Sequence, residues 1–498
     1  MWTLTEMRDN IADRRVGLLP HRLCWKLSRR SFRAMNHKKC SLGLIRLYLL
    51  FAVALTLAVP ASAEWKEKVL YSFQGGANDG AGPVGGVVFD KQGNLYGVLQ
   101  FYGPGSCGPI GNECGTVFQL APPAQKGDPW TETLLYKFGG KGVNDGESPN
   151  SGLIIDSLGN LYGVTAYGGT GDCVLLGVPA GCGTVYEISP PKQKGGAWKE
   201  TILYSFPTTK HGYVPIGNLV FDGVGNLYGA TLYGGTKGTT CDGYYGGQCG
   251  TVFELSPPKT KGGKWMEKVL HSFAGVAQGK QYGDGANPNG GLVLDSKGAV
   301  YGTTFAGGSG DWGTAFELRP PTTRSGLWTE KMLHRFQGSR DGVNPAAGLT
   351  FGSNGDLYGT TLTGGPGGGG GTVFRLTPPA GKSGTWQKTI LHGFNGTGGG
   401  LDAESPVVFA ANGSLYGTTL DSGGAYYGTV FRLKPPKQRG DPWTFTMLYG
   451  FQAPPDGGQP AAGLIFDKNG NLYSTTTQGG VSTGCSFRGC GTVYEVSP

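Results

Sequence analysis

The sequence predicts an all-β protein: a seven-bladed β-propeller of four-stranded antiparallel blades, in which the N-terminal strand joins the last blade and closes the ring. The prediction rests on two recurring phrases. Asn-Leu-Tyr-Gly, first seen at Asn94–Gly97, occurs with small changes in seven copies, and a phrase close to Gly-Thr-Val-Phe follows each copy. Successive copies are 57 to 73 residues apart, which suits one four-stranded blade per copy. No stretch after residue 63 shows the apolar period of a helix.

Each copy contains four segments with the composition of strands. The first follows the pattern Trp-x-Glu-x-x-Leu-Tyr-x-Phe, as at Trp65–Phe73, and the second follows Gly-Leu-x-x-Asp, as at Gly152–Asp156. The third and fourth segments are the two recurring phrases. All four are rich in β-branched and aromatic residues and are bounded by Gly, Pro, Asn or Asp, which predicts strands. The link Asp156–Asn160 is short enough to form a hairpin turn.

Two other architectures fit parts of the pattern. The chain has 94 Gly among 498 residues, a content that also occurs in disordered proteins. These glycines fall at turns between apolar segments, which favours a folded chain. A β-solenoid is the structural alternative, but it would have shorter coils and parallel strand pairing.

The problem of exposed sheet edges fixes the expected order of strands within a blade. An open ring leaves two unpaired edges, and sharing strands between the first and last copies removes them. If the Trp segment is outermost, Trp65–Phe73 completes the last blade beside Gly491–Val496. The Gly-Leu segment is then innermost, because its small Gly suits the crowded axis of the ring.

Residues 1–63 differ in kind from the rest and are expected to be an export leader. A basic segment ends at Arg46, the apolar run Leu47–Val59 follows, and Ala61-Ser62-Ala63 resembles a cleavage site. We expect cleavage after Ala63, with Met35 as the true start and 64–498 as a single propeller. An uncleaved anchor helix and a twin-arginine signal at Ser28–Phe32 are alternatives. The mature protein is expected to be secreted or periplasmic, with membrane contact only during export.

The charge balance supports the same division. The chain has 42 Lys+Arg and 34 Asp+Glu, of which the leader holds 11 and 3. The remainder therefore has 42 − 11 = 31 basic and 34 − 3 = 31 acidic residues, which is formally neutral. The basic balance of the whole chain thus belongs to the leader and gives no support for nucleic-acid binding, which needs a basic face on the folded domain.

Eight cysteines after the leader form four local pairs. Each pair lies between the third and fourth segments of one copy, and it is present or absent as a pair: Cys107/Cys114, Cys173/Cys182, Cys241/Cys249 and Cys485/Cys490. In an exported chain this pattern predicts four disulfides, each closing one loop. Structural zinc is the alternative, but it needs four converging ligands, and these pairs belong to different blades.

The predicted topology places the cysteine loops on one face of the ring. Loops after the second and fourth strands of a meander emerge at the same end, so this face should also carry the Asp-Gly loops at Asp79, Asp145, Asp284, Asp341 and Asp456. Those Asp side chains fit turns better than calcium sites, because no Asp-x-Asp-x-Asp-Gly run occurs. Aromatic residues gather in the same loops and form the candidate ligand face: Tyr102, Tyr167, Tyr233, Tyr244, Tyr245, Trp312, Tyr426 and Tyr427.

Two functions remain open at this stage. Clustered aromatic side chains can stack on sugars or anchor a protein, which predicts a monomeric, non-catalytic binding or scaffold propeller for a glycan or cell-surface protein. The alternative is that these rings pack on their own loops. The second function is an extracellular polysaccharide hydrolase or lyase with paired carboxylates on the same face. His271, His334 and His392 replace Tyr in the Trp segment and are expected at the rim, and His211 lies in a face loop. No catalytic residue, cofactor or metal site is predicted.

The recurring phrases resemble those of a known family. Repeated Leu-Tyr-Gly-Thr-Thr, Gly-Gly and Gly-Thr-Val-Phe-Glu-Leu-Ser-Pro-Pro phrases over residues 65–498 are similar to the GloVer-repeat, or choice-of-anchor tandem-repeat, proteins. The resemblance implies export and, in some members, a C-terminal sorting anchor. No anchor helix is expected here, because the sequence stops at Pro498 after the last strand. The resemblance implies no activity for any residue.

Overall fold

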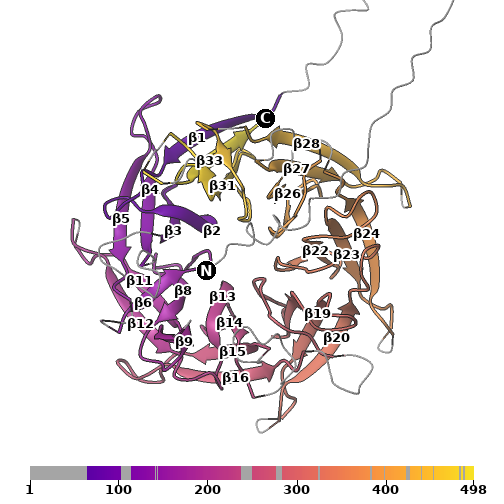
Figure 1. The fold of residues 1–498 in the computed structure, drawn as a ribbon, viewed down its shortest axis with the longest axis horizontal. Coiled ribbons are helices and arrows are strands. Elements are labelled where there is room, and N and C mark those ends of the chain that lie inside the picture. The colour runs from indigo at the N-terminus through magenta and orange to yellow at the C-terminus, as the bar shows by residue number, and fades with distance from the viewer. Residues whose placement is uncertain are drawn as a thin grey trace, which may run out of the picture. The chain divides into compact units, whose positions relative to one another are not determined.

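The computed structural model describes residues 64–498 except 102–113, 141, 143, 176, 194, 237–248, 276–282, 324–325, 382–383, 397–398, 422–426, 439, 453, 482–483 and 486–487. The predictions for the leader therefore lie outside the described residues. Residues Trp65–Pro498 form one compact unit, which is a closed ring of sheets (Figure 1). No helix in the described part of the chain is long and apolar enough to cross a membrane.

Seven antiparallel sheets form the blades, and strands are given below from the ring axis outwards. Blade 1 has β2 (Ala81–Phe89), β3 (Leu95–Phe101), β4 (Thr116–Ala121) and β5 (Thr131–Lys137). Blade 2 has β6 (Gly146–Pro149) with β7 (Ile154–Ile155), β8 (Leu161–Gly168), β11 (Thr184–Ser189) and β12 (Lys199–Ser205). Blade 3 has β13 (Tyr213–Phe221), β14 (Leu227–Tyr233), β15 (Thr251–Ser256) and β16 (Met266–Ser272).

The remaining blades repeat this order. Blade 4 has β17 (Val293–Leu294), β18 (Val300–Thr304), β19 (Thr314–Arg319) and β20 (Thr329–Arg335). Blade 5 has β21 (Thr350–Phe351), β22 (Leu357–Thr361), β23 (Thr372–Thr377) and β24 (Gln387–Gly393). Blade 6 has β25 (Val408–Phe409), β26 (Leu415–Thr419), β27 (Thr429–Lys434) and β28 (Thr444–Gly450). Blade 7 has β30 (Ile465–Phe466), β31 (Leu472–Thr476), β33 (Thr492–Ser497) and β1 (Lys66–Ser72). Two small hairpins pair β9 (Val174–Leu175) with β10 (Val178–Pro179), and β29 (Gly457–Gly458) with β32 (Gln478–Gly479).

Blade 7 confirms the predicted closure of the ring. Strand β1 pairs antiparallel with β33 from Lys66↔Ser497 to Ser72↔Thr492, so the first and last strands share one sheet. The two strands lie side by side at the edge of the ring in Figure 1. The Trp segment is outermost in every blade, as predicted, and the Gly-Leu segment is innermost.

Glycine is needed where innermost segments of neighbouring blades meet. A Cβ added at Gly85 would lie 2.2 Å from the backbone nitrogen of Gly152 in the next blade. At Gly290 it would lie 2.4 Å from the carbonyl carbon of Ala347. Real Cβ atoms do not approach other atoms this closely, so any side chain there would push neighbouring blades apart at the axis.

The hydrophobic core lies between blades rather than within one sheet. The Phe of each Gly-Thr-Val-Phe phrase is fully buried, as at Phe118 and Phe253. The Phe253 ring packs on Gly229 of the Leu-Tyr-Gly phrase, where a Cβ would come within 2.5 Å of its Cζ. The Tyr of the Leu-Tyr-Gly phrase meets the Trp of the following blade, as in the Tyr96–Trp198 pair, whose ring centroids lie 5.8 Å apart. These contacts explain why the phrases recur together.

Paired threonines link the second and third strands of six blades. The hydroxyls are 2.8–2.9 Å apart in Thr165–Thr184, Thr231–Thr251, Thr304–Thr314, Thr361–Thr372, Thr419–Thr429 and Thr476–Thr492. Blade 1 has Leu99 in place of the first threonine, opposite Thr116. Within the described residues, the buried Thr116 hydroxyl has no hydrogen-bond partner. One buried hydroxyl in seven equivalent sites is therefore unsatisfied.

The same substitution should have opposite effects at two of these equivalent positions. Thr116→Val removes an unsatisfied hydroxyl and should raise the free energy of unfolding by about 1 kcal/mol. Thr251→Val removes one hydrogen bond to the Thr231 hydroxyl, which keeps its bonds to the Tyr233 carbonyl and to the backbone N–H of residue 251. It should therefore lower the free energy of unfolding by about 1 kcal/mol. Urea unfolding of both variants measures the difference. Equal effects of the same sign would contradict this interpretation.

Candidate functional site

The innermost segments of all seven blades enclose a central channel. Its cavity has a volume of about 440 Å³ and is lined by residues from 84–88, 150–153, 216–218, 289–293, 346–349, 404–406 and 461–465. A cavity of this size and position, where several elements converge, is the usual place for a small ligand. Only closure of the ring brings these seven segments together (Figure 1).

Amide side chains supply most of the polarity of the channel. Asn150, Asn218 and Asn289 line it, and Glu404 is the one carboxylate among the described lining residues. The Oδ1 atom of Asn218 accepts the backbone N–H of Gly152 at 2.8 Å, which ties blade 3 to blade 2 beside the cavity. Most other lining positions are Gly, Ala or small aliphatic residues. Apart from Glu404, the described lining therefore offers neutral donors and acceptors on a wall of small residues.

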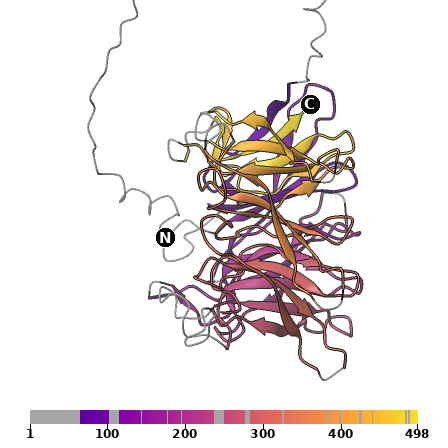
Figure 2. The ribbon, with the colours of Figure 1, turned by 90° about the vertical axis from the view of Figure 1, so that its right-hand side faces the viewer.

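One face of the ring, which we call the stapled-loop face, carries the cysteine loops and the Asp-Gly loops. The start of β2 pairs with the end of β3 (Ala81↔Phe101), and the start of β4 pairs with the end of β5 (Thr116↔Lys137). Both sets of loops consequently emerge at one end of each blade, as predicted. Figure 2 shows the ring from its side, with loops extending from its two faces.

Two of the predicted disulfides are confirmed in the described residues. Cys173–Cys182 and Cys485–Cys490 have S–S distances of 2.07 and 1.98 Å. Cys114 and Cys249 are also disulfide-bonded, but their predicted partners, Cys107 and Cys241, lie outside the described residues. The blade 7 cystine packs on the loop that enters blade 1, because the backbone N–H of Gly82 donates to the Cys490 carbonyl at 2.9 Å. The stapled loops are thus joined to their neighbours.

The structure places four of the eight candidate aromatic residues. Tyr167 is only 8% exposed and belongs to a core cluster with Cys173, Leu175 and Cys182, so the stapled loop of blade 2 folds over it. Tyr233 is half-buried and its ring lies 5.4 Å from that of Tyr213. Tyr427 is half-buried against Gly458. Trp312 is 38% exposed. Tyr102, Tyr244, Tyr245 and Tyr426 lie outside the described residues.

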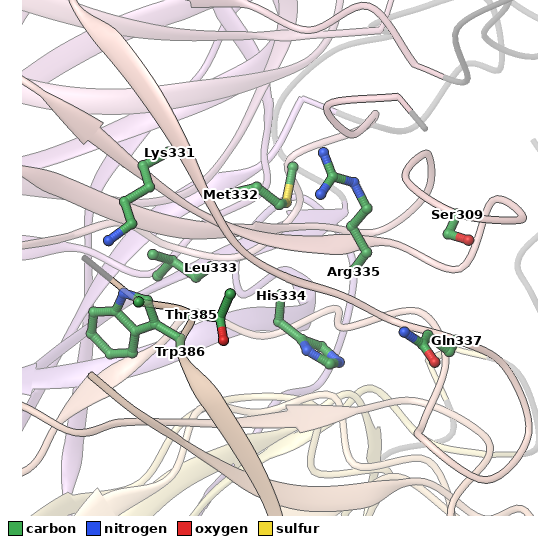
Figure 3. A pocket seen from close by; sticks show the side chains of 10 residues that line it. Ser309, Lys331, Met332, Leu333, His334, Arg335, Gln337, Thr385 and Trp386 are labelled. Carbon is green, nitrogen blue, oxygen red and sulfur yellow. The ribbon is translucent and has the colours of Figure 1, made fainter. Parts of the chain in front are cut away.

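A larger depression lies on the outer side of the ring. It has a volume of about 710 Å³ and is lined by the side chains of β20 and by Trp386 (Figure 3). Figure 3 shows Lys331 and Trp386 towards one end and Ser309 and Gln337 towards the other. His334, between them, is already bonded to Asp341 at 2.8 Å. None of the predicted ligand residues lines this groove, and it lies away from the ring axis.

Titratable groups gather at the outer edge of each junction between blades, in what we call rim clusters. Each cluster has three members. The first is a Tyr or His on the outer strand of one blade. The second is the residue in the Asp position of the Asp-Gly loop that follows this strand, and the third is the third residue of the Trp segment of the following blade. From the junction of blades 7 and 1 onwards, the clusters are Tyr71/Asp79/Glu132, Tyr136/Asp145/Glu200, Tyr204/His211/Glu267, His271/Asp284/Glu330, His334/Asp341/Lys388, His392/Gly399/Phe445 and Tyr449/Asp456/Glu67.

Direct contacts hold the rim clusters together. Tyr71, Tyr136 and Tyr449 donate to Asp79, Asp145 and Asp456 at 3.2, 2.8 and 2.8 Å. The same Asp residues accept backbone N–H groups of their turns, as expected for turn-forming Asp. His211, which takes the place of Asp in its cluster, lies 2.9 Å from Glu267. In the cluster that has Gly399 and Phe445 in place of Asp and Glu, the ring of His392 stacks on that of Phe445, with 4.2 Å between the ring centroids.

Sequence reasoning placed the rim histidines correctly but missed the clusters. Glu132 is far from Asp79 along the chain, and only the packing of successive blades joins them. Comparison of equivalent positions offers a signal: Lys388 and Phe445 replace the recurring Glu, and His211 and Gly399 replace the recurring Asp. Perturbed titratable groups often mark functional sites. Here they recur around the whole ring, which indicates a structural role at blade junctions.

Burial raises the pKa of three rim glutamates to neutral pH or slightly above it. Burial, reinforced by the charge of Asp456, raises the pKa of Glu67 to about 8. Burial and Asp79 raise the pKa of Glu132 to about 7, and burial and Asp145 raise that of Glu200 to about 8. The ordinary pKa of these carboxyl groups is 4.5. Between pH 4.5 and about pH 7 to 8, the folded protein therefore binds protons that the unfolded chain releases.

The protein should therefore lose stability as the pH rises. The contribution of these glutamates is complete below pH 4.5 and is lost as the pH rises through about 7 to 8. We expect a lower urea midpoint at pH 8 than at pH 5. The triple variant with Glu67→Gln, Glu132→Gln and Glu200→Gln should show a flatter dependence over this range. An unchanged pH dependence in the triple variant would refute the assignment.

The sheet order and recurring phrases define the protein as a seven-bladed propeller built of tandem repeats. The chain belongs to the Gloeobacter/Verrucomicrobia repeat family, whose model matches residues 59–281 and 237–487. A search of curated proteins found no match.

Solved structures similar to the chain include proteins with several different activities. A protein of unknown function from Dyadobacter fermentans is 11% identical, with a TM-score of 0.41, over 88% of this chain and 99% of that one. A gluconolactonase from Xanthomonas campestris is 14% identical, with a TM-score of 0.35, over 72% and 89%. The NanB sialidase from Streptococcus pneumoniae is 11% identical, with a TM-score of 0.39, over 89% and 72%. These likenesses are too distant to assign an activity to this chain.

Proposed function

We propose that this protein is an exported, non-catalytic binding propeller that takes a neutral glycan on its stapled-loop face, with sugar units entering the central channel. The observation that carries the proposal is the amide lining of the channel by Asn150, Asn218 and Asn289. An amide offers donors and acceptors together, as sugar hydroxyl groups do, and needs no charged ligand. The cavity volume of about 440 Å³ suits a short stretch of glycan.

Two further observations support this function. The disulfides Cys173–Cys182 and Cys485–Cys490 fit an exported protein, and they restrain loops at the channel face before a ligand arrives. Trp312 presents an exposed ring on the same face, on which a sugar can stack. A glycan is favoured over a protein partner because the polar groups lie inside a cavity rather than on a broad flat surface.

Variants in the channel should separate binding from folding. After a glycan array has identified a ligand, Asn150→Ala and Asn289→Ala should each weaken its binding about tenfold, the loss of a good hydrogen bond. Trp312→Ala should weaken it by a smaller factor. Asn354→Ala is the matched control, because Asn354 is exposed in the hairpin link between β21 and β22 at the other face. Isothermal titration calorimetry measures all four variants.

Three results would contradict the proposal. The first is an array without a glycan ligand. The second is a ligand whose affinity does not change in Asn150→Ala and Asn289→Ala. The third is the release of reducing ends from the bound glycan by the wild-type protein, which would indicate a hydrolase or lyase instead.

A further inference from the structure

The rim cluster between blades 3 and 4 differs from the other six in its chemistry. It combines the imidazole of His271 on β16, the carboxylate of Asp284 before β17 and the carboxylate of Glu330 on β20. One ligand atom from each side chain lies within 4.8 Å of the other two. The strands β16 and β20 are the outer strands of adjacent blades in Figure 1. These three groups thus converge from two blades.

The geometry of His271 and Asp284 suits a shared cation. Nε2 of His271 lies 3.2 Å from Oδ2 of Asp284. Two ligand atoms bound to one Zn²⁺ at about 2.1 Å, in tetrahedral geometry, lie roughly 3.4 Å apart. The other carboxylate oxygen, Oδ1 of Asp284, accepts the backbone N–H of Ala274 at 2.7 Å, which orients the carboxylate. Side-chain exposures of 11% for His271 and 22% for Asp284 leave a path for solvent.

The six equivalent clusters lack this combination of groups. Three have two carboxylates but carry Tyr71, Tyr136 or Tyr449, whose phenols donate to Asp. The Tyr204 cluster has His211 in place of Asp. Beside His334, the ammonium of Lys388 takes the place of the second carboxylate and lies 2.9 Å from Asp341. Beside His392, both carboxylates are replaced, by Gly399 and Phe445. The equivalent junctions therefore act as internal controls.

We propose that His271, Asp284 and Glu330 bind a divalent transition cation of the zinc type at the junction of blades 3 and 4. One imidazole nitrogen and two carboxylate oxygens are ligands that Zn²⁺ accepts, with water completing its coordination. Ca²⁺ prefers six to eight oxygen ligands and does not require an imidazole. The cation would cross-link two outer strands and stabilise the folded ring, since the unfolded chain does not hold these ligands together.

Zinc titration of the chelator-treated full chain tests the proposal. We expect one Zn²⁺ per chain by calorimetry, a higher melting temperature with zinc, and no comparable effect of Ca²⁺. His271→Ala and Glu330→Gln should each weaken binding at least tenfold, whereas His334→Ala should not. His271→Tyr restores the residue of the Tyr71 and Tyr136 clusters, so this variant should fold and not bind.

A gain of binding provides the stricter test. Lys388→Glu gives the cluster of His334 and Asp341 the composition of the proposed site. The substitution removes the ion-pair partner of Asp341 and destabilises the metal-free chain, so this variant should bind a second Zn²⁺ per chain and gain more melting temperature from zinc than the wild-type chain does. The proposal is overturned if the wild-type chain takes up no stoichiometric zinc, if Ca²⁺ raises the melting temperature as much as zinc does, or if zinc binding survives in both His271→Ala and His271→Tyr.

Discussion

Removal of residues 64–73, which carry β1, should leave the ring open at blade 7 and severely destabilise it. Strand β1 supplies the outer edge of the last sheet and pairs with β33 along its whole length. The removed segment also contains Leu70 and Phe73, both buried in the core between blades 7 and 1. Loss of two large apolar side chains from a core costs roughly 5–10 kcal/mol. The exposed edge of β33 would add a tendency to aggregate.

Urea unfolding of a chain that begins at Gln74 measures this effect. A synthetic peptide of residues 64–73 should restore part of the lost stability when it is added in excess. The same peptide with Phe73→Ala is the matched control and should restore much less. If the shortened chain unfolds at the midpoint of the intact chain, β1 does not close the ring.

Lys388→Ala should cause the largest loss of stability among single substitutions in the rim clusters. The Lys388 side chain is 5% exposed, and its Nζ lies 2.9 Å from Oδ1 of Asp341 and over the rings of Phe336 and Phe374 at 5.0 and 5.4 Å. Burial raises the pKa of Asp341, but hydrogen bonds from His334 and Lys388 and the charge of Lys388 outweigh it and lower that pKa to about 2. Removal of one partner from a buried ion pair costs about 3–5 kcal/mol.

Lys331→Ala is the matched control for this substitution. Lys331 lies on the neighbouring outer strand, in the groove of Figure 3, and its replacement should change the free energy of unfolding by less than about 0.5 kcal/mol. Urea unfolding at pH 6 compares the two variants. Similar small effects of both substitutions would show that the Asp341–Lys388 pair contributes little to the ring.

The architecture could be predicted from the sequence because it follows from local patterns that repeat. The seven copies specify the number of sheets, and the sheet-edge argument places Trp65–Phe73 beside the last strand. Both predictions are confirmed. Two cysteine pairs could also be predicted, because their members lie in one loop. The spacing within a copy is enough for these features.

The proposed binding site could not be predicted in the same way. Asn150, Asn218 and Asn289 come from three copies, and no local pattern shows that their side chains share one cavity. The burial of Tyr167 also could not be predicted from the sequence, because it depends on how the cysteine loop of blade 2 places Leu175 and Cys182 over the Tyr167 ring. Sequence alone identifies aromatic residues in loops, but exposure depends on the path of each loop.

Hydrogen–deuterium exchange in the presence of a glycan identified on the array tests the central claim most directly. We predict that the glycan slows exchange in the innermost segments 84–88, 150–153, 216–218 and 289–293 and in adjoining loops of the stapled-loop face. Protection restricted to the outer strands β5, β12 and β16, or to the hairpins of the opposite face, would contradict the claim that the amide-lined channel is the binding site.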